Sequence, residues 1–184
     1  MNRYFILFLL LLLPVNSFAL IEVDITRGNL NPLPIAVSPL SIDEDSKKSF
    51  EKILKKKDIG SEISKVIENN LKISGLFNPL NKDAFLQAPD IANLKPRFED
   101  WNLIKAQALI TGKVNFINDK LRVEFRLWDV LAGKEMMALA FTTVPNNWRR
   151  VGHIITDKVY ERLTGEKGYF DTRIIYVAEE GPKT

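Results

Sequence analysis

The chain has 184 residues, and they include no cysteine and a single histidine, His153. Without cysteine no disulfide framework can form, so the fold must rest on its hydrophobic core. Transition-metal sites draw mainly on Cys and His side chains. The sequence therefore predicts that the protein holds no metal, and it shows no loop typical of a cofactor site.

A recognisable catalytic set is also missing. His153 lacks a Ser or Cys nucleophile in a suitable setting, and its position favours a packed or half-exposed helix histidine. The adjacent acids at 43–45 indicate a loop, and Asp129 and Asp157 are interpreted as lone acids near an element end or on a helix surface. We expect no catalytic residues and no enzymatic activity.

Charge of one sign is not in excess. The chain has 26 Lys and Arg against 23 Asp and Glu, which gives a net charge of +3. This small surplus argues against a nucleic-acid partner. A hydrophobic content of 46% is ordinary for a globular domain, so a core can be buried.

Residues 1–19 are typical of a secretory signal peptide. A short positive start precedes the apolar run YFILFLLLLLPV, and Ser17 and Ala19 are the small residues of a cleavage site. A membrane anchor is the alternative, but Pro14 breaks the run before the roughly 20 residues that a spanning helix needs. We expect cleavage between Ala19 and Leu20 and a soluble, exported chain.

The first part of the mature chain predicts two strands and a loop. Residues Ile21–Thr26 alternate apolar and polar side chains, and Pro34–Leu40 forms a more apolar second strand. The charged stretch 41–57 is interpreted as a solvated loop with one amphipathic turn. A surface for anionic lipid or an acidic partner is the alternative, and the acids at 43–45 weaken it.

Two helices are predicted next. The first begins at the cap Asp58 and ends at Ser74 and Gly75, with Ile59, Ile63, Val66, Ile67 and Leu71 on one face. The second covers 98–107. Its buried side is predicted to be Phe98, Trp101, Leu103 and Ile104.

The second half of the chain predicts three strands and a final helix. Strands over 108–117, 120–130 and 134–144 are separated by short turns, which favours an antiparallel meander. The helix spans 148–163, is capped by Asn146 or Asn147, and ends at Gly165. The fold class is therefore α/β (α+β), with two to three helices packed on a mixed sheet of about five strands.

Several blocks along the mature chain together resemble one family. They are IEVDITRGN, PIAVSPL, SGLFNPLN, ALITGKVN, LWDVLAG and WRRVGHIITDKVYERLTGEKGYFDTRIIYV. The ordered set is similar to the amino-terminal domain of the TolB family, which belongs to the Tol-Pal system of Gram-negative bacteria. The resemblance implies a TolB-like α/β domain over 20–168. It also implies that 169–184 begins a β-propeller that this chain lacks, with TRIIYV as its first strand and Phe170 to Thr184 loosely held.

The resemblance further implies a monomeric periplasmic adaptor that supports outer-membrane integrity and envelope invagination during cell division, and that meets the envelope only through partners. In the family, most of the contact with Pal belongs to the propeller, and the mature N-terminal segment reaches TolA. That segment is strand-prone, and such a segment can add to the edge of a partner's sheet. It carries over to Leu20, Ile21, Glu22, Val23, Asp24, Ile25, Thr26 and Arg27. A stand-alone periplasmic ligand-binding domain and a non-functional truncated fragment are the alternatives.

Overall fold

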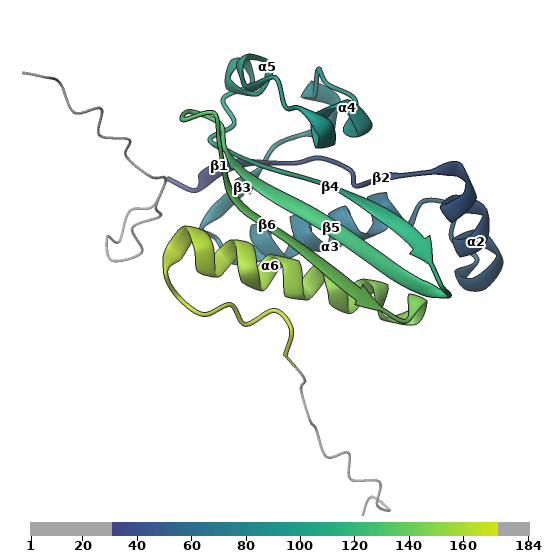
Figure 1. Ribbon diagram of the computed structural model, residues 1–184. Helices are drawn as coiled ribbons and strands as arrows, with labels where there is room; N and C mark the ends of the chain where they lie inside the picture. The colour runs from purple at the N-terminus through teal and green to yellow at the C-terminus, as the bar shows by residue number, and fades with distance from the viewer. Residues whose placement is uncertain (1–30, 173–184) are drawn as a thin grey trace, which may run out of the picture.

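The computed structural model describes residues 31–172, and they form a mixed sheet covered by helices (Figure 1). The sheet order is β3-β1-β4-β5-β6, and the short β2 pairs with β4 beside this path. Strand β1 runs parallel to β3 and β4, while β4, β5 and β6 are antiparallel. The predicted fold class is confirmed, with β2 as a sixth strand. The strands are β1 (Leu33–Val37), β2 (Ser41–Ile42), β3 (Phe77–Pro79), β4 (Ala108–Ile117), β5 (Lys120–Asp129) and β6 (Lys134–Thr143).

Five helices pack around this sheet in the described part of the chain. They are α2 (Glu44–Leu54), α3 (Ile59–Ile73), α4 (Pro89–Leu94), α5 (Phe98–Leu103) and α6 (Trp148–Thr164), with the 3-10 turns η1 (Lys82–Ala84) and η2 (Pro145–Asn147). The long helices α3 and α6 cover one face, and the short α4 and α5 lie over the other (Figure 1). Between residues 31 and 172, no helix is both long and apolar enough to cross a membrane.

The meander β4-β5-β6 agrees with its sequence pattern. The four apolar side chains at alternate positions of β5 are all buried: Leu121, Val123, Phe125 and Leu127. The turn between β4 and β5 is formed by Asn118 and Asp119, whose φ angles are 51° and 58°. Asn and Asp accept this left-handed backbone more readily than most residues, which fixes the hairpin register.

Two separate cores lie on the two faces of the sheet. The larger one joins the sheet to α3 and α6, and the predicted apolar face of α3 is buried in it, as are Trp148, Val151, Ile155, Val159 and Leu163 of α6. The smaller core lies under α4 and α5 and contains Trp101, Leu109 and Val130. Asn147 precedes helix α6, and its side-chain amide donates to Thr143 without capping the helix. Gly165 follows the last helical residue with a left-handed φ of 76°.

The prediction of a solvated loop over 41–57 was wrong, because this stretch holds β2 and the 11-residue helix α2. The carboxylate of Asp43 caps α2 by accepting from the backbone N–H of Ser46 at 2.8 Å. Phe50 is fully buried and packs edge-on against Phe116, with ring centroids 5.4 Å apart. One aromatic anchor fixes a helix whose remaining surface is charged, and this is why the sequence pattern was weak.

The predicted helix over 98–107 is shorter than expected. Helix α5 ends at Leu103, which is 74% exposed, so Leu103 does not belong to the predicted buried side. Lys105 then takes a left-handed φ of 64°, and the N–H of Gln107 donates to the carbonyl of Pro34 at 2.9 Å. The chain has therefore already joined the sheet at Gln107. Trp101 is buried as predicted.

Two short elements were missed, and one strand is shorter than predicted. Strand β1 stops at Val37, since the chain is redirected ahead of Pro39. Strand β3 lies between the two predicted helices, where no strand was predicted, and it pairs with β1 from Leu33 opposite Phe77. Helix α4 spans only 6 residues. A strand of 3 residues carries too little periodicity to be recognised.

Candidate functional site

The sequence-based partner site lies outside the described residues. This holds for Leu20 to Arg27, for the cleavage pair Ala19 and Leu20, for the strand Ile21–Thr26, and for TRIIYV at 172–177 beyond Thr172. Those assignments stay predictions. The described residues nevertheless contain a cluster of specific contacts near their C-terminal end, where the chain leaves α6.

Residues 165–172, called the connector below, turn back along α6 after the helix ends (Figure 1). The carboxylate of Asp157 holds the connector, because Oδ1 accepts from the N–H of Phe170 at 2.7 Å and Oδ2 from the N–H of Asp171 at 3.1 Å. Hydrogen bonds to an ionised acceptor are stronger than neutral ones. A Cβ at Gly168 would overlap Asp157, so glycine permits this approach.

A second clasp joins the connector to the beginning of α6. The guanidinium of Arg150 binds Asp171 in a two-pronged arrangement, with Nε 3.0 Å from Oδ1 and Nη2 3.0 Å from Oδ2. The hydrogen bond and the charge of Asp171 raise the pKa of Arg150. Since Arg150 is exposed, solvent screens this pair and it adds little stability. Its main effect is to fix the direction in which the connector runs along α6.

Aromatic rings fill the space between the connector and the helix. Tyr160 of α6 lies edge-on to both Tyr169 and Phe170, at centroid distances of 5.6 and 5.8 Å. It also meets Phe77 of β3 edge-on, at a centroid distance of 6.2 Å. Burial, and then the neighbouring Tyr169 and Glu166, raise the pKa of Tyr160. The ring of Phe170 packs against the larger core.

Two sequence-based interpretations are corrected by this geometry. Asp157 is not a lone surface acid, because it binds two consecutive backbone N–H groups of the connector. Phe170, Asp171 and Thr172 belong to the described structure, and the first two are held, so the expectation that Phe170 onward is loosely held is wrong for this part. Asp157 and Gly168 lie 11 positions apart in the sequence, and no short motif links them, so the sequence alone did not reveal their contact.

The other singled-out polar residues have structural partners. Asp129 is 1% exposed and accepts from the N–H of Ala132 at 2.8 Å, which closes the β5–β6 turn. His153 is half-buried, and its Nδ1 lies 2.9 Å from the amide nitrogen of Asn70, so it joins α6 to α3. Between residues 31 and 172, every buried side-chain nitrogen and oxygen has a hydrogen-bond partner, and no three His, Cys, Asp or Glu side chains gather as a metal site would require.

Comparisons with known proteins agree with the resemblance in the sequence. Residues 21–136 match the family described as the TolB amino-terminal domain. The Tol-Pal system protein TolB of Pelagibacter ubique (strain HTCC1062) is 82% identical over 183 residues, which is 99% of this chain and 41% of that protein. The crystal structure of TolB from Acinetobacter baumannii superimposes with a TM-score of 0.59 and 20% identity, covering 83% of this chain and 33% of that one. The chain therefore spans less than half the length of these relatives.

Proposed function

Because this chain belongs to the TolB amino-terminal domain family, we propose that it acts in the periplasm as an adaptor domain of the Tol-Pal system. The observation that carries the proposal is the 82% identity to a Tol-Pal system protein along 99% of the chain. The proposed role is to maintain outer-membrane integrity and support envelope invagination during division through contacts with TolA and Pal. Family membership agrees with the expectation that the chain is not an enzyme.

We assign the TolA contact to residues 20–27. Their alternating pattern suits a strand that adds to the edge of a partner's sheet. In that mode main-chain hydrogen bonds provide affinity, and every second side chain provides specificity. A short segment that exchanges between docked and free positions would let a partner shift its population.

The connector supports a role as one part of a larger adaptor. Asp157 and Arg150 hold it at two points, so Phe170 and Asp171 have a fixed position relative to α6. A domain attached after the connector would therefore start from a fixed point beside α6. We propose that the Pal contact belongs to such a following domain, and that this domain's own contribution is the TolA segment.

The test compares the mature chain, residues 20–184, with a version that lacks residues 20–27. Binding to the isolated periplasmic part of TolA is measured by calorimetry, and folding by circular dichroism. We expect the deletion to abolish binding and leave the helical signal intact. Unchanged TolA binding would contradict the assignment, and a lost helical signal would show that the segment is structural.

Two single substitutions then separate strand addition from side-chain contact. Val23→Pro removes one main-chain N–H, whereas Val23→Ala only shortens a side chain. If the segment pairs as a strand, the proline variant loses far more affinity than the alanine variant. Equal losses would argue that side chains alone make the contact.

A further inference from the structure

A basic cleft lies between the end of α2 and the beginning of α3. Its volume is about 550 Å³, which is large enough for a small ligand. Five lysines and two carboxylates are among the residues that line it, together with Pro39 and Ser61. The lysines are Lys55, Lys56, Lys57, Lys65 and Lys82, and the acids are Asp58 and Glu62.

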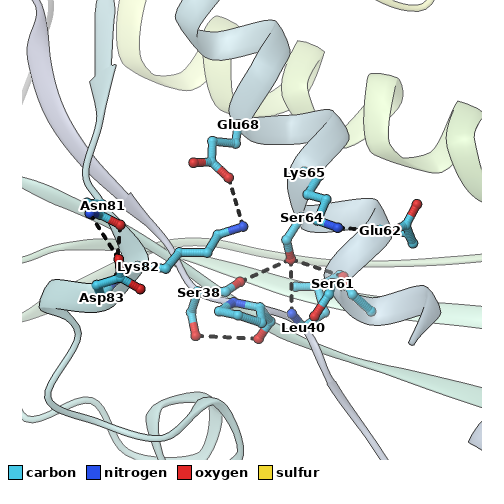
Figure 2. A network of polar contacts seen from close by, with 12 residues as sticks. Ser38, Leu40, Ser61, Glu62, Ser64, Lys65, Glu68, Asn81, Lys82 and Asp83 are labelled. Carbon is cyan, nitrogen blue, oxygen red and sulfur yellow. Dashed lines mark hydrogen bonds and ion pairs between the residues drawn. The ribbon is translucent and has the colours of Figure 1, made fainter. Parts of the chain in front are cut away.

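Hydrogen bonds hold the wall of this cleft in place (Figure 2). The hydroxyl of Ser64 on α3 accepts from the N–H of Leu40 at 3.0 Å, and the carbonyl oxygens of Ser38 and Gly60, each 3.1 Å away, share its single proton as acceptors. The segment that carries Pro39 is therefore tied to the buried side of α3. On the same helix, Glu68 holds Lys82 at 2.8 Å, which brings this lysine across from η1.

The acids of the cleft do not balance its lysines. Glu62 is shared, because its two carboxylate oxygens lie 3.4 Å from Lys56 and 3.1 Å from Lys65. Asp58 accepts from the N–H and the hydroxyl of Ser61 and is occupied as the cap of α3. Lys55 has no acidic partner in the described part of the chain. Outside the lining, Glu51 lies 3.8 Å from Lys57 and Glu68 lies 2.8 Å from Lys82, so the remaining positive charge of the cleft rests on Lys55.

Lys55 occupies a backbone position that ordinarily favours glycine. It caps the C-terminus of α2 with a left-handed φ of 56°. Glycine takes this conformation without strain, whereas a side chain with a Cβ does so at a cost. The chain therefore keeps a lysine at the rim of the cleft at the expense of local backbone strain, and such strain often accompanies function.

We propose that this cleft binds a phosphate group that carries two negative charges. Lysine binds phosphate as a point charge, whereas arginine pairs with both carboxylate and phosphate through two parallel hydrogen bonds. All five cations of the lining are lysines, and the attraction of a point charge grows with the charge of the anion, which favours a doubly charged phosphate over a carboxylate with one charge. The proposal is independent of the Tol-Pal role.

The test uses a matched pair of glycine substitutions in the whole mature chain. Lys55→Gly removes a cation from the cleft and relieves a left-handed residue. Lys105→Gly also replaces a lysine that has a left-handed φ, here 64°, but this lysine lies in the turn after α5 and does not line the cleft. Both variants are expected to fold at least as well as the parent chain. Only Lys55→Gly should weaken binding of inorganic pyrophosphate, by about threefold in physiological salt.

A third variant tests whether removing a negative charge from the cleft strengthens phosphate binding. Glu62→Gln frees Lys56 and Lys65 from their shared carboxylate, so pyrophosphate binding should tighten by about twofold. Calorimetry at constant ionic strength measures all three variants. Weaker binding in Glu62→Gln would overturn the proposal. So would absence of binding to any phosphate probe, or equal losses in Lys55→Gly and Lys105→Gly, since equal losses mean unspecific attraction.

Vesicle binding distinguishes the two sources of phosphate. The probes are phosphatidylcholine vesicles with and without phosphatidic acid, whose headgroup is a phosphate monoester. Binding of pyrophosphate alone, with the expected variant pattern, identifies a free phosphate compound as the ligand. Binding to phosphatidic acid vesicles with the same pattern identifies a lipid headgroup, and vesicle binding that ignores Lys55→Gly contradicts the cleft as the site.

Discussion

The carboxylate of Asp157 accepts the backbone N–H of Phe170 at 2.7 Å across 13 positions of sequence. Together with its bond to Asp171, this contact ties the connector to α6. We predict that Asp157→Asn destabilises the domain by about 1–3 kcal/mol, because the new amide cannot accept at both positions and leaves one N–H without a partner. Urea unfolding measures the loss, and hydrogen exchange should show faster exchange at Phe170 and Asp171.

The control for this prediction is Asp119→Asn in the β4–β5 turn. It changes charge equally, and asparagine accepts the φ of 58° found there. Its stability should stay within about 0.5 kcal/mol of the parent chain. If both variants lose the same stability, net charge is the cause and the clasp by Asp157 is unimportant.

Phe50 is the anchor of α2, and its removal tests the helix that sequence patterns did not reveal. Phe50→Ala should cost about 3–5 kcal/mol, since a fully buried ring is lost together with its edge-on contact to Phe116. Ile53→Ala on the same helix removes a side chain that is 48% exposed and should cost far less. Urea unfolding compares them. A small loss in Phe50→Ala would mean that α2 does not support the core.

Asp43 predicts a pH effect at the start of α2. The backbone N–H of Ser46, and then its hydroxyl, lower the pKa of Asp43 below its ordinary value of 3.8. A pKa that is lower in the folded than in the unfolded chain adds stability above about pH 3.8, and this gain is lost as the pH falls through the folded value. Asp43→Asn keeps a cap acceptor, so stability at neutral pH should change by under about 0.5 kcal/mol.

Unfolding of Asp43→Asn at neutral pH and at about pH 3 measures this dependence. The variant should lose less stability on acidification than the parent chain does, because it lacks the titrating cap. Glu62, Glu124 and Glu161 also have lowered pKa values and contribute to acid loss in both proteins. If both proteins lose the same stability on acidification, Asp43 does not contribute to the pH dependence.

Regular periodicity made most of the fold predictable. In β5 every second residue enters the core. The two-residue turn of Asn118 and Asp119 places Ile117 opposite Lys120 and so fixes the register between β4 and β5. The apolar face of α3 and its end at Gly75 were also predictable, because helix burial repeats over 15 residues. Such long elements contain enough repeats to overcome single exceptions.

Other parts depend on contacts between distant residues. Strand β3 exists because Phe77 pairs with Leu33 far along the chain, and α2 exists because Phe50 meets Phe116. The clasp of Asp157 is of the same kind, since one acid binds two N–H groups whose position follows from the path after Gly165. Local propensity carries no signal for contacts of this type.

The antiparallel course of the connector along α6 has a mechanical consequence. Tension applied at Thr172 away from the helix would load the Arg150 and Asp157 contacts one after the other, as in peeling. Such contacts yield at lower force than strands sheared in parallel. A pull on the chain at Thr172 would therefore first extend the connector by roughly 25 Å, at about 3.3 Å per residue. Single-molecule stretching would show this as a low-force step before the domain unfolds, and one-step rupture would contradict it.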